Sequence, residues 1–239
     1  MLKQASEVIS TLLRVLRIRF DKSPIGRMPQ LVEFVTTRSA YVAQTSLYGY
    51  LKTRMGREYV NIFNDDEFLP SIEQAKWEIY AACLSDLTIY AVSLAVDRGG
   101  LERGGAVSLA QHLHSICVND TFEGRVAESM RMHALSRFER RSGSTIWANA
   151  VVGEAAFSQS PPALADSSPV SDEYKDLDRE IVMNSIRLRW SDVRNQLRKR
   201  LDGTSICTEW MSGMHSRNPL DVPPVAGDSR TTDQQARSN

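Results

Sequence analysis

The chain has 239 residues, and its 29 Lys and Arg side chains balance 29 Asp and Glu, so its formal net charge is zero. This balance argues against a dedicated nucleic-acid-binding protein, because such domains normally carry a basic excess. Hydrophobic residues make up 42% of the chain, which is typical of a globular protein with one substantial core or two small ones. Three widely spaced cysteines without a CxxC pair favour a reducing compartment, and we expect a cytoplasmic protein.

The first predicted element is a basic, amphipathic helix over residues 2–20, which we treat with its flanks as a separate N-terminal segment, 1–22. Its apolar residues recur with helical period on one face, and its polar face is net basic. The charged residues of this helix are Lys3, Arg14, Arg17 and Arg19 against Glu7. Such a helix can pack on its own bundle, dock in the groove of a partner protein or lie on an anionic membrane surface.

Two long helices follow, over residues 29–55 and 71–97. Pro29 suits the first turn of the first of them, and the polar stretch 57–70 separates the two. The second helix is followed by two pairs of glycines, at which it is expected to stop. We predict that these helices form the central antiparallel pair of a bundle.

The run from residue 79 to 96 reads IYAACLSDLTIYAVSLAV and carries a single charge, Asp86. A run of this length could span a membrane, but a central Asp costs roughly 3 kcal/mol on the insertion scale. Charged residues also stand close to both ends of the run. We therefore interpret it as the core helix of a bundle, in which Asp86 needs a partner.

The second half of the chain predicts further helices and two irregular segments. The helices are expected over residues 106–118, 122–141, 145–157 and 172–201. Residues 158–171 are rich in Pro and Ser and predict a loop or linker. Residues 213–239 are too polar to form a core, and we expect a disordered tail there. The predicted fold is all-α, a bundle of six or seven helices over residues 28–203.

Arg38 is the predicted partner of Asp86. It lies in the middle of the apolar face of the helix 29–55, next to the helix that carries Asp86. A guanidinium beside a buried carboxylate keeps the carboxylate ionised through charge-assisted hydrogen bonds. Such a pair can fix the register of two helices, or it can form the floor of an anion-binding or acid–base pocket.

An enzymatic alternative would use the same pair. In that case the pocket would be completed by the tyrosines of the two long helices, which are Tyr41, Tyr48, Tyr80 and Tyr90. The chain contains no GxSxG elbow, no HExxH and no phosphate-binding loop. We therefore predict no metal and no cofactor, and the catalytic residues of such an enzyme stay unknown.

Residues 31–56 and 75–92 resemble segments of uncharacterised helical proteins of alphaproteobacteria, some of which are labelled esterases. The resemblance spans residues 28–97. It implies a bacterial, cytoplasm-facing protein, and it brings no catalytic residue with it.

The absence of a catalytic constellation favours a non-enzymatic interaction, scaffold or assembly protein with a protein partner and no nucleic acid. One alternative is an esterase-like hydrolase or small-ligand-binding protein with its pocket around Asp86 and Arg38. The other is a peripheral protein of the inner membrane that is anchored by residues 2–20.

Overall fold

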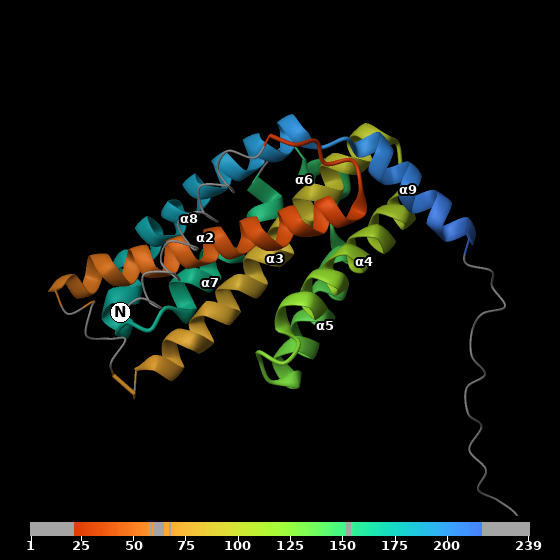
Figure 1. Ribbon diagram of the computed structural model, residues 1–239. Coiled ribbons are helices and arrows are strands. Elements are labelled where there is room, and N and C mark those ends of the chain that lie inside the picture. The colour runs from red at the N-terminus through yellow and green to blue at the C-terminus, as the bar shows by residue number, and fades with distance from the viewer. Residues whose placement is uncertain (1–21, 58, 60–64, 67, 152–153, 217–239) are drawn as a thin grey trace, which may run out of the picture.

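The computed structural model describes residues 22–57, 59, 65–66, 68–151 and 154–216, and these form a bundle of α-helices (Figure 1). Within them the elements are α2 (Met28–Met55), α3 (Leu69–Gly99), α4 (Arg103–Phe122), α5 (Glu128–Ser144), α6 (Trp147–Ala150), the 3-10 turn η2 (Glu154–Phe157), α7 (Ser160–Ser167), α8 (Asp172–Arg200) and α9 (Gly203–Ser216). The predicted all-α, multi-helix bundle is confirmed. The described residues contain two short helices, α6 and α7, and the terminal α9 beside the longer predicted ones.

Helix α3 is the centre of the bundle. It packs against α2, α4, α5, α6, η2, α7 and α9. Every residue from 82 to 95 is buried, so this helix is apolar on all sides rather than on one face. By length and composition α3 could cross a membrane, and in the described part of the chain its apolar stretch lies inside the protein.

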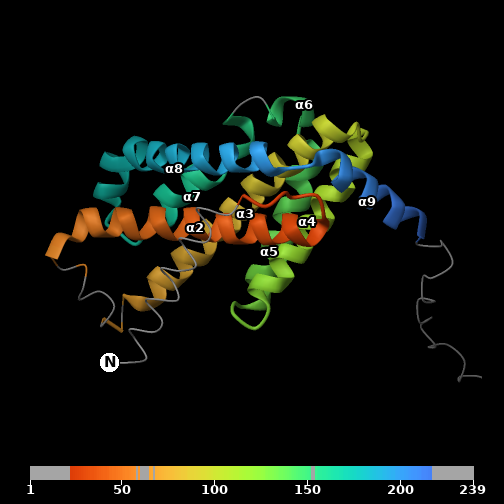
Figure 2. The same cartoon turned by 45° about the horizontal axis from the view of Figure 1, so that its top comes forward.

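Helices α2 and α3 run in opposite directions, as predicted, and α8 lies along α2 at the edge of the bundle (Figures 1 and 2). Helix α7 packs between α3 and α8. The chain before α2 is fixed to the end of α8, because the Ile25 N–H donates to the Arg200 carbonyl (2.8 Å) and the Asp202 N–H donates to the Ile25 carbonyl (2.9 Å).

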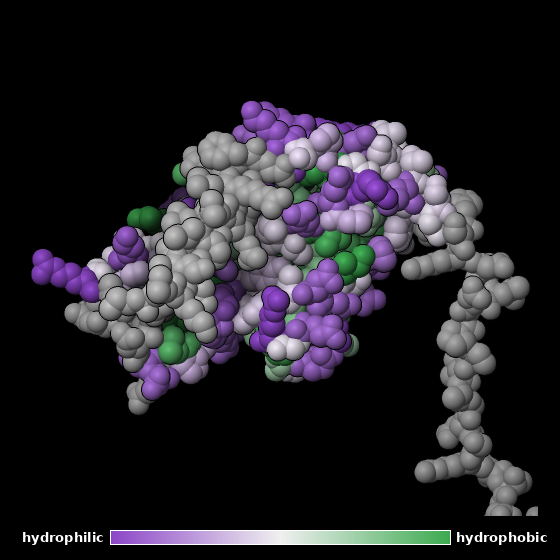
Figure 3. Space-filling model, in the orientation of Figure 1, coloured by the Kyte–Doolittle hydropathy of each residue, from purple (hydrophilic) through white to green (hydrophobic). Residues whose placement is uncertain are grey.

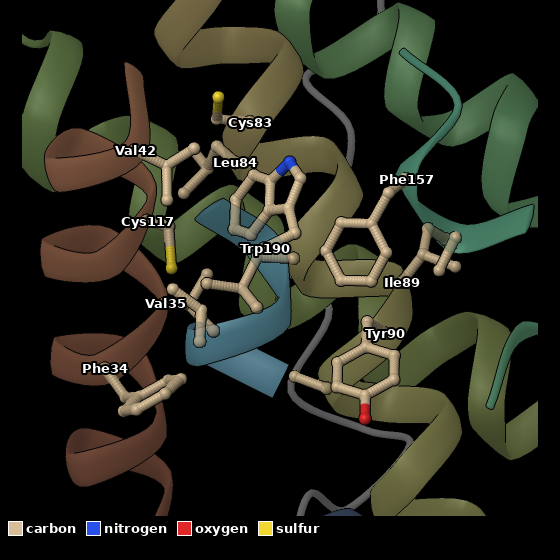
Figure 4. Close-up of a cluster of buried hydrophobic side chains, with 14 of the residues drawn as sticks. Phe34, Val35, Val42, Cys83, Leu84, Ile89, Tyr90, Cys117, Phe157 and Trp190 are labelled. Atoms are coloured by element: carbon tan, nitrogen blue, oxygen red, sulfur yellow. The ribbon is translucent and has the colours of Figure 1, made fainter. Parts of the chain in front are cut away.

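Trp190 of α8 fills the core between these helices (Figure 4). Its ring lies 4.8 Å from that of Phe157, and the Phe157 ring lies 5.2 Å from that of Tyr90 on α3. These aromatic rings connect η2 and α8 to the central helix, one turn after Asp86.

Helix α9 crosses the end of α3 through two glycines that allow their backbones to meet. A Cβ atom on Gly203 would stand 2.7 Å from the Ala95 carbonyl oxygen, and one on Gly99 would stand 2.8 Å from the Gly203 carbonyl oxygen. Arg98 then closes the end of α8, because its guanidinium donates to the carbonyls of Arg198 (2.8 Å) and Leu201 (2.5 Å).

Three of the predicted segments differ from the structure or lie outside its described residues. The linker predicted at residues 158–171 is wrong, since residues 160–167 form α7, whose first turn contains two prolines that only a helix start tolerates. The disordered tail predicted from residue 213 begins too early, because α9 continues to Ser216. The predicted helix 2–20 and the rest of the tail lie outside the described residues.

Candidate functional site

Asp86 is completely buried at the middle of α3, and both of its carboxylate oxygens accept hydrogen bonds. Oδ1 accepts from Arg141 Nη1 (2.7 Å) and from the Gln159 backbone N–H (3.1 Å). Oδ2 accepts from the Ser160 backbone N–H (2.8 Å). The lone charge of the apolar run therefore has a counter-charge and two main-chain donors.

The two main-chain donors belong to the start of α7. Gln159 is the N-cap residue of that helix, and its own side chain makes no capping hydrogen bond. The first N–H groups of a helix have no partner within the helix and carry the positive end of its dipole. Asp86 thus caps α7 from a different helix, 74 residues earlier in the chain.

Arg141, near the end of α5, supplies the counter-charge, and its side chain is only 11% exposed. Nη1 also donates to Ser85 Oγ (2.7 Å), and Nη2 donates to the Ala156 carbonyl of η2 (2.8 Å). The guanidinium therefore connects α5, α3 and η2 around one buried point.

Ser160 extends this network to α8. Its hydroxyl accepts a hydrogen bond from the indole N–H of Trp190 (2.9 Å) while its main chain binds Asp86. Four helices thus meet at one polar cluster, which we call the Asp86 cluster and define as Ser85, Asp86, Arg141, Gln159, Ser160 and Trp190.

Burial dominates the electrostatics of this region. It raises the pKa of the Asp86 carboxyl, against the opposing effect of the Arg141 charge and of the Ser160 hydrogen bonds. The hydrogen bonds that Asp86 accepts from Arg141, Gln159 and Ser160 come from N–H groups, and such bonds favour the ionised carboxylate. Burial and the Asp86 charge raise the pKa of the neighbouring Cys83 thiol, which makes it a poor nucleophile.

His114 of α4 lies nearby and is kept neutral. Its ring stacks on that of Phe138, with the centroids 3.8 Å apart and the planes 5° from parallel. Burial, together with the positive charge of Arg141, lowers the pKa of His114 to about 3. An imidazole in this state belongs to the core and does not exchange protons near neutral pH.

The predicted pairing of Asp86 with Arg38 is wrong. Arg38 is buried on α2, but its Nε donates to Gln196 Oε1 of α8 (2.9 Å), and its guanidinium lies 5.1 Å from the centre of the Phe34 ring. The prediction assumed that two charges on neighbouring helices would meet. The two side chains point in different directions, because Arg38 points toward α8 and Asp86 points toward α5 and α7.

The four tyrosines are also spread over the bundle. Tyr41 and Tyr48 are half-buried on α2. Tyr80 packs with Trp77 and Phe122, with ring centroids 6.0 and 5.8 Å away. Tyr90 is buried one turn after Asp86, under the guanidinium of Arg194 (5.7 Å from the ring centre). The structure does not join the six predicted site residues into one pocket.

The sequence carried signals for the residues that the prediction missed. Arg141 stands three residues after Phe138, on the side of the helix that carries Met130 and Ala134, so it continues an apolar stripe. Ser160 precedes Pro161 and Pro162, which is a pattern typical of a first helical turn. Neither signal identifies the partner of Asp86 without the three-dimensional arrangement.

A hollow of about 450 Å³ on the described surface lies elsewhere, between the start of α2 and α9. It is lined by Gly26, Arg27, Thr204, Ser205, Thr208, Glu209 and Ser212, and by none of the six predicted site residues. Within the described residues no group of three or more His, Cys, Asp or Glu side chains is placed to hold a metal ion. No protein-family model matches the chain, and no curated protein or solved structure matches it.

Proposed function

We propose that this protein is a non-enzymatic helical interaction protein, a scaffold or assembly factor of the bacterial cytoplasm, which binds a partner protein through the outer face of α8. The observation that carries the proposal is a line of exposed hydrophobic side chains on that face. They are Tyr174, Leu177, Ile181 and Leu188, which we call the α8 stripe.

The α8 stripe stands out from the rest of the described surface. Leu177, Ile181 and Leu188 are 70%, 73% and 74% exposed, and the opposite face of α8 is buried against the bundle. The face of the molecule in Figure 3 is mainly hydrophilic with small hydrophobic patches. Tyr174, Leu177 and Ile181 follow one another at successive turns, and Leu188 lies two turns beyond Ile181 on the same side. Neighbouring exposed hydrophobic side chains are a feature of interaction surfaces, whereas isolated ones are ordinary.

The hydrogen bonds of the buried Asp86 cluster support a non-enzymatic role as well. A buried carboxylate with a cavity beside it would favour a ligand-binding or hydrolytic site. Here each carboxylate oxygen of Asp86 accepts at least one hydrogen bond from the fold itself, and Arg38 is engaged by Gln196. The charges that motivated the hydrolase alternative thus have structural partners. The membrane-anchor alternative depends on residues 2–20, outside the described part of the chain.

In-cell photo-crosslinking of the full chain tests this function. A photoreactive amino acid would replace Leu177 or Leu188, with Ile146 as the control position, since Ile146 is 67% exposed but lies between α5 and α6. We expect discrete adducts from the α8 positions, none of the same mass from position 146, and their loss when Ile181→Glu is added. Absence of α8 adducts, or the same adducts from position 146, would overturn the proposal.

A further inference from the structure

We infer that the partner of the α8 stripe is a second copy of this chain, with the two α8 helices packed antiparallel about a twofold axis at Ile181. This inference rests on the proposed function. It is carried by three properties of α8, which are the heptad spacing of its stripe, the reversal of charge along its length and the position of Ile181 midway between Tyr174 and Leu188.

The stripe has the spacing of a coiled-coil seam. Tyr174, Ile181 and Leu188 follow one another at intervals of seven residues, and Leu177 occupies the intermediate position three residues after Tyr174. Apolar residues at this spacing form a line that a second helix can cover along its whole length. The line starts beside Tyr174, over which Arg54 stands 5.0 Å from the ring centre, and extends past the middle of α8.

The charge of α8 reverses along the helix. Residues 172–180 contain five acidic and two basic side chains, and residues 187–200 contain six basic and one acidic side chain. In a parallel pair the acidic halves would face each other, as would the basic halves. In an antiparallel pair with its axis at Ile181, residues 172–180 of one chain face residues 182–190 of the other, which carry two basic side chains, Arg187 and Arg189, and no acidic one. Charge complementarity therefore favours a second copy in the antiparallel orientation.

Ile181 lies midway between the two outer residues of the stripe, Tyr174 and Leu188. Tyr174 and Leu188 lie seven residues to either side of it, so a twofold axis at Ile181 places Ile181 on its own copy and Tyr174 on Leu188 of the other chain. Along one flank of the stripe stand Glu173, Glu180 and Arg187, again at seven-residue intervals. The same axis puts Arg187 of one chain opposite position 175 of the other, between its two glutamates, and puts Arg189 opposite Glu173, so that ion pairs can form across the interface.

The surroundings of α8 leave this face available. The helix packs on α7 and α2 through Asp178, Val182, Ile186, Trp190, Val193 and Leu197, which are buried on its inner side. Asp178 is held there by Arg54 and by the Tyr50 hydroxyl (3.0 Å). A second copy would therefore add to a rigid face without rearrangement of the bundle.

Disulfide trapping of the full chain tests the orientation. The natural cysteines Cys83, Cys117 and Cys207 are buried, so Ile181→Cys introduces an exposed thiol at the twofold axis. With diamide as oxidant, the two introduced thiols, one from each chain, lose two electrons and two protons and form one disulfide between chains. We expect a covalent dimer from Ile181→Cys and much less from Ile146→Cys. Equal yields from the two positions, or no dimer, would overturn the inference.

Charge reversal tests the pairing by sedimentation of the full chain over a range of concentrations. We expect a dimer that Glu180→Arg weakens about tenfold or more, and that Glu180→Arg combined with Arg187→Glu restores. The charge changes lie on the exposed flank, and circular dichroism checks that the helices are kept. A double variant no tighter than the single one would overturn the antiparallel register.

The experiments distinguish failure of the dimer from failure of the interaction surface on α8. A chain that is monomeric in both tests, but whose α8 positions still crosslink a different protein in cells, would overturn the dimer and keep the interaction surface. A disulfide within one chain in the variant Leu12→Cys/Ile181→Cys, without covalent dimer, would place the N-terminal segment on the stripe and overturn the dimer. Loss of both the dimer and the α8 adducts would overturn both proposals.

Discussion

The substitution Asp86→Asn removes one charge from the centre of the bundle and keeps the shape of the side chain. The remaining oxygen can still accept hydrogen bonds, but the new amide group replaces the other oxygen. If it takes the place of Oδ2, it points a donor at the Ser160 N–H, which then has no acceptor. If it takes the place of Oδ1, it faces Arg141 and Gln159 in the same way.

The expected loss of stability comes from the groups that remain buried after the substitution. Arg141 keeps its charge with a side chain only 11% exposed, and loss of one member of a buried ion pair costs roughly 3–5 kcal/mol. The unsatisfied N–H groups, at about 1–3 kcal/mol each, are part of that cost. In a chain of this length each kcal/mol lowers the melting temperature by about 2–4 °C. We therefore expect Asp86→Asn to melt roughly 6–20 °C below the wild type.

The measurement is urea and thermal unfolding followed by circular dichroism, with Asp166→Asn as the matched control. Asp166 bonds Arg179 at 2.6 Å, but both side chains are about half exposed. An exposed pair of this kind contributes about 0–1 kcal/mol. The control should therefore melt within a few degrees of the wild type, although it loses the same kind of charge.

A double-mutant cycle with Arg141→Met distinguishes the ion pair from a general effect of core mutation. Once Arg141 is gone, the change of Asp86 to Asn no longer leaves a buried guanidinium without its counter-charge. The double variant should therefore be more stable than the sum of the two single losses predicts, by about 1–3 kcal/mol. Additive losses, or an Asp86→Asn protein as stable as the control, would refute the role assigned to this pair.

Two further predictions concern His114 and the crossing of α3 with α9. His114 takes up a proton below about pH 6.5 in the unfolded chain, but only near pH 3 in the folded chain. The free energy of unfolding should therefore fall by about 1.4 kcal/mol per pH unit as the pH drops from about 6 to about 4. The variant His114→Phe should reduce this dependence of stability on pH, whereas His133→Phe, at an exposed position, should not. Urea titrations at several pH values measure the slopes, and equal slopes for the two variants would refute the role of His114. Gly203→Ala should lose about 1–3 kcal/mol because its Cβ meets backbone of α3, whereas Gly104→Ala, with open space around it, should be neutral or stabilising. Thermal unfolding of these two proteins checks this, and equal melting temperatures would contradict the close crossing.

The all-α bundle and its central pair were predictable because they depend on local patterns. A continuous apolar run with a helical composition, as in residues 79–96, has few alternatives to a core helix. The burial of Asp86 and its need for a partner followed from the same run. Its partner did not follow, because partners are set by the rotation and tilt of helices, and the pattern of one helix does not fix these for its neighbour.

The segment around residue 160 shows a different limit. Its Pro and Ser content predicted a linker, yet the same residues begin α7. An eight-residue helix has little stability alone, so its formation depends on tertiary contacts that composition does not report. Here the contact is the carboxylate of Asp86, which makes one charge in the first half of the chain a condition for structure in the second.

The cap that Asp86 places on α7 also bears on the order of synthesis. Asp86 leaves the ribosome 74 residues before Ser160, and at about 5–20 residues per second this interval lasts roughly 4–15 s. During that time the apolar centre of α3 exists without α7 and α8 to cover it, and its carboxylate has no main-chain donors. The nascent chain therefore passes through a stage in which its most hydrophobic helix is incomplete, and this is when it would depend most on a chaperone.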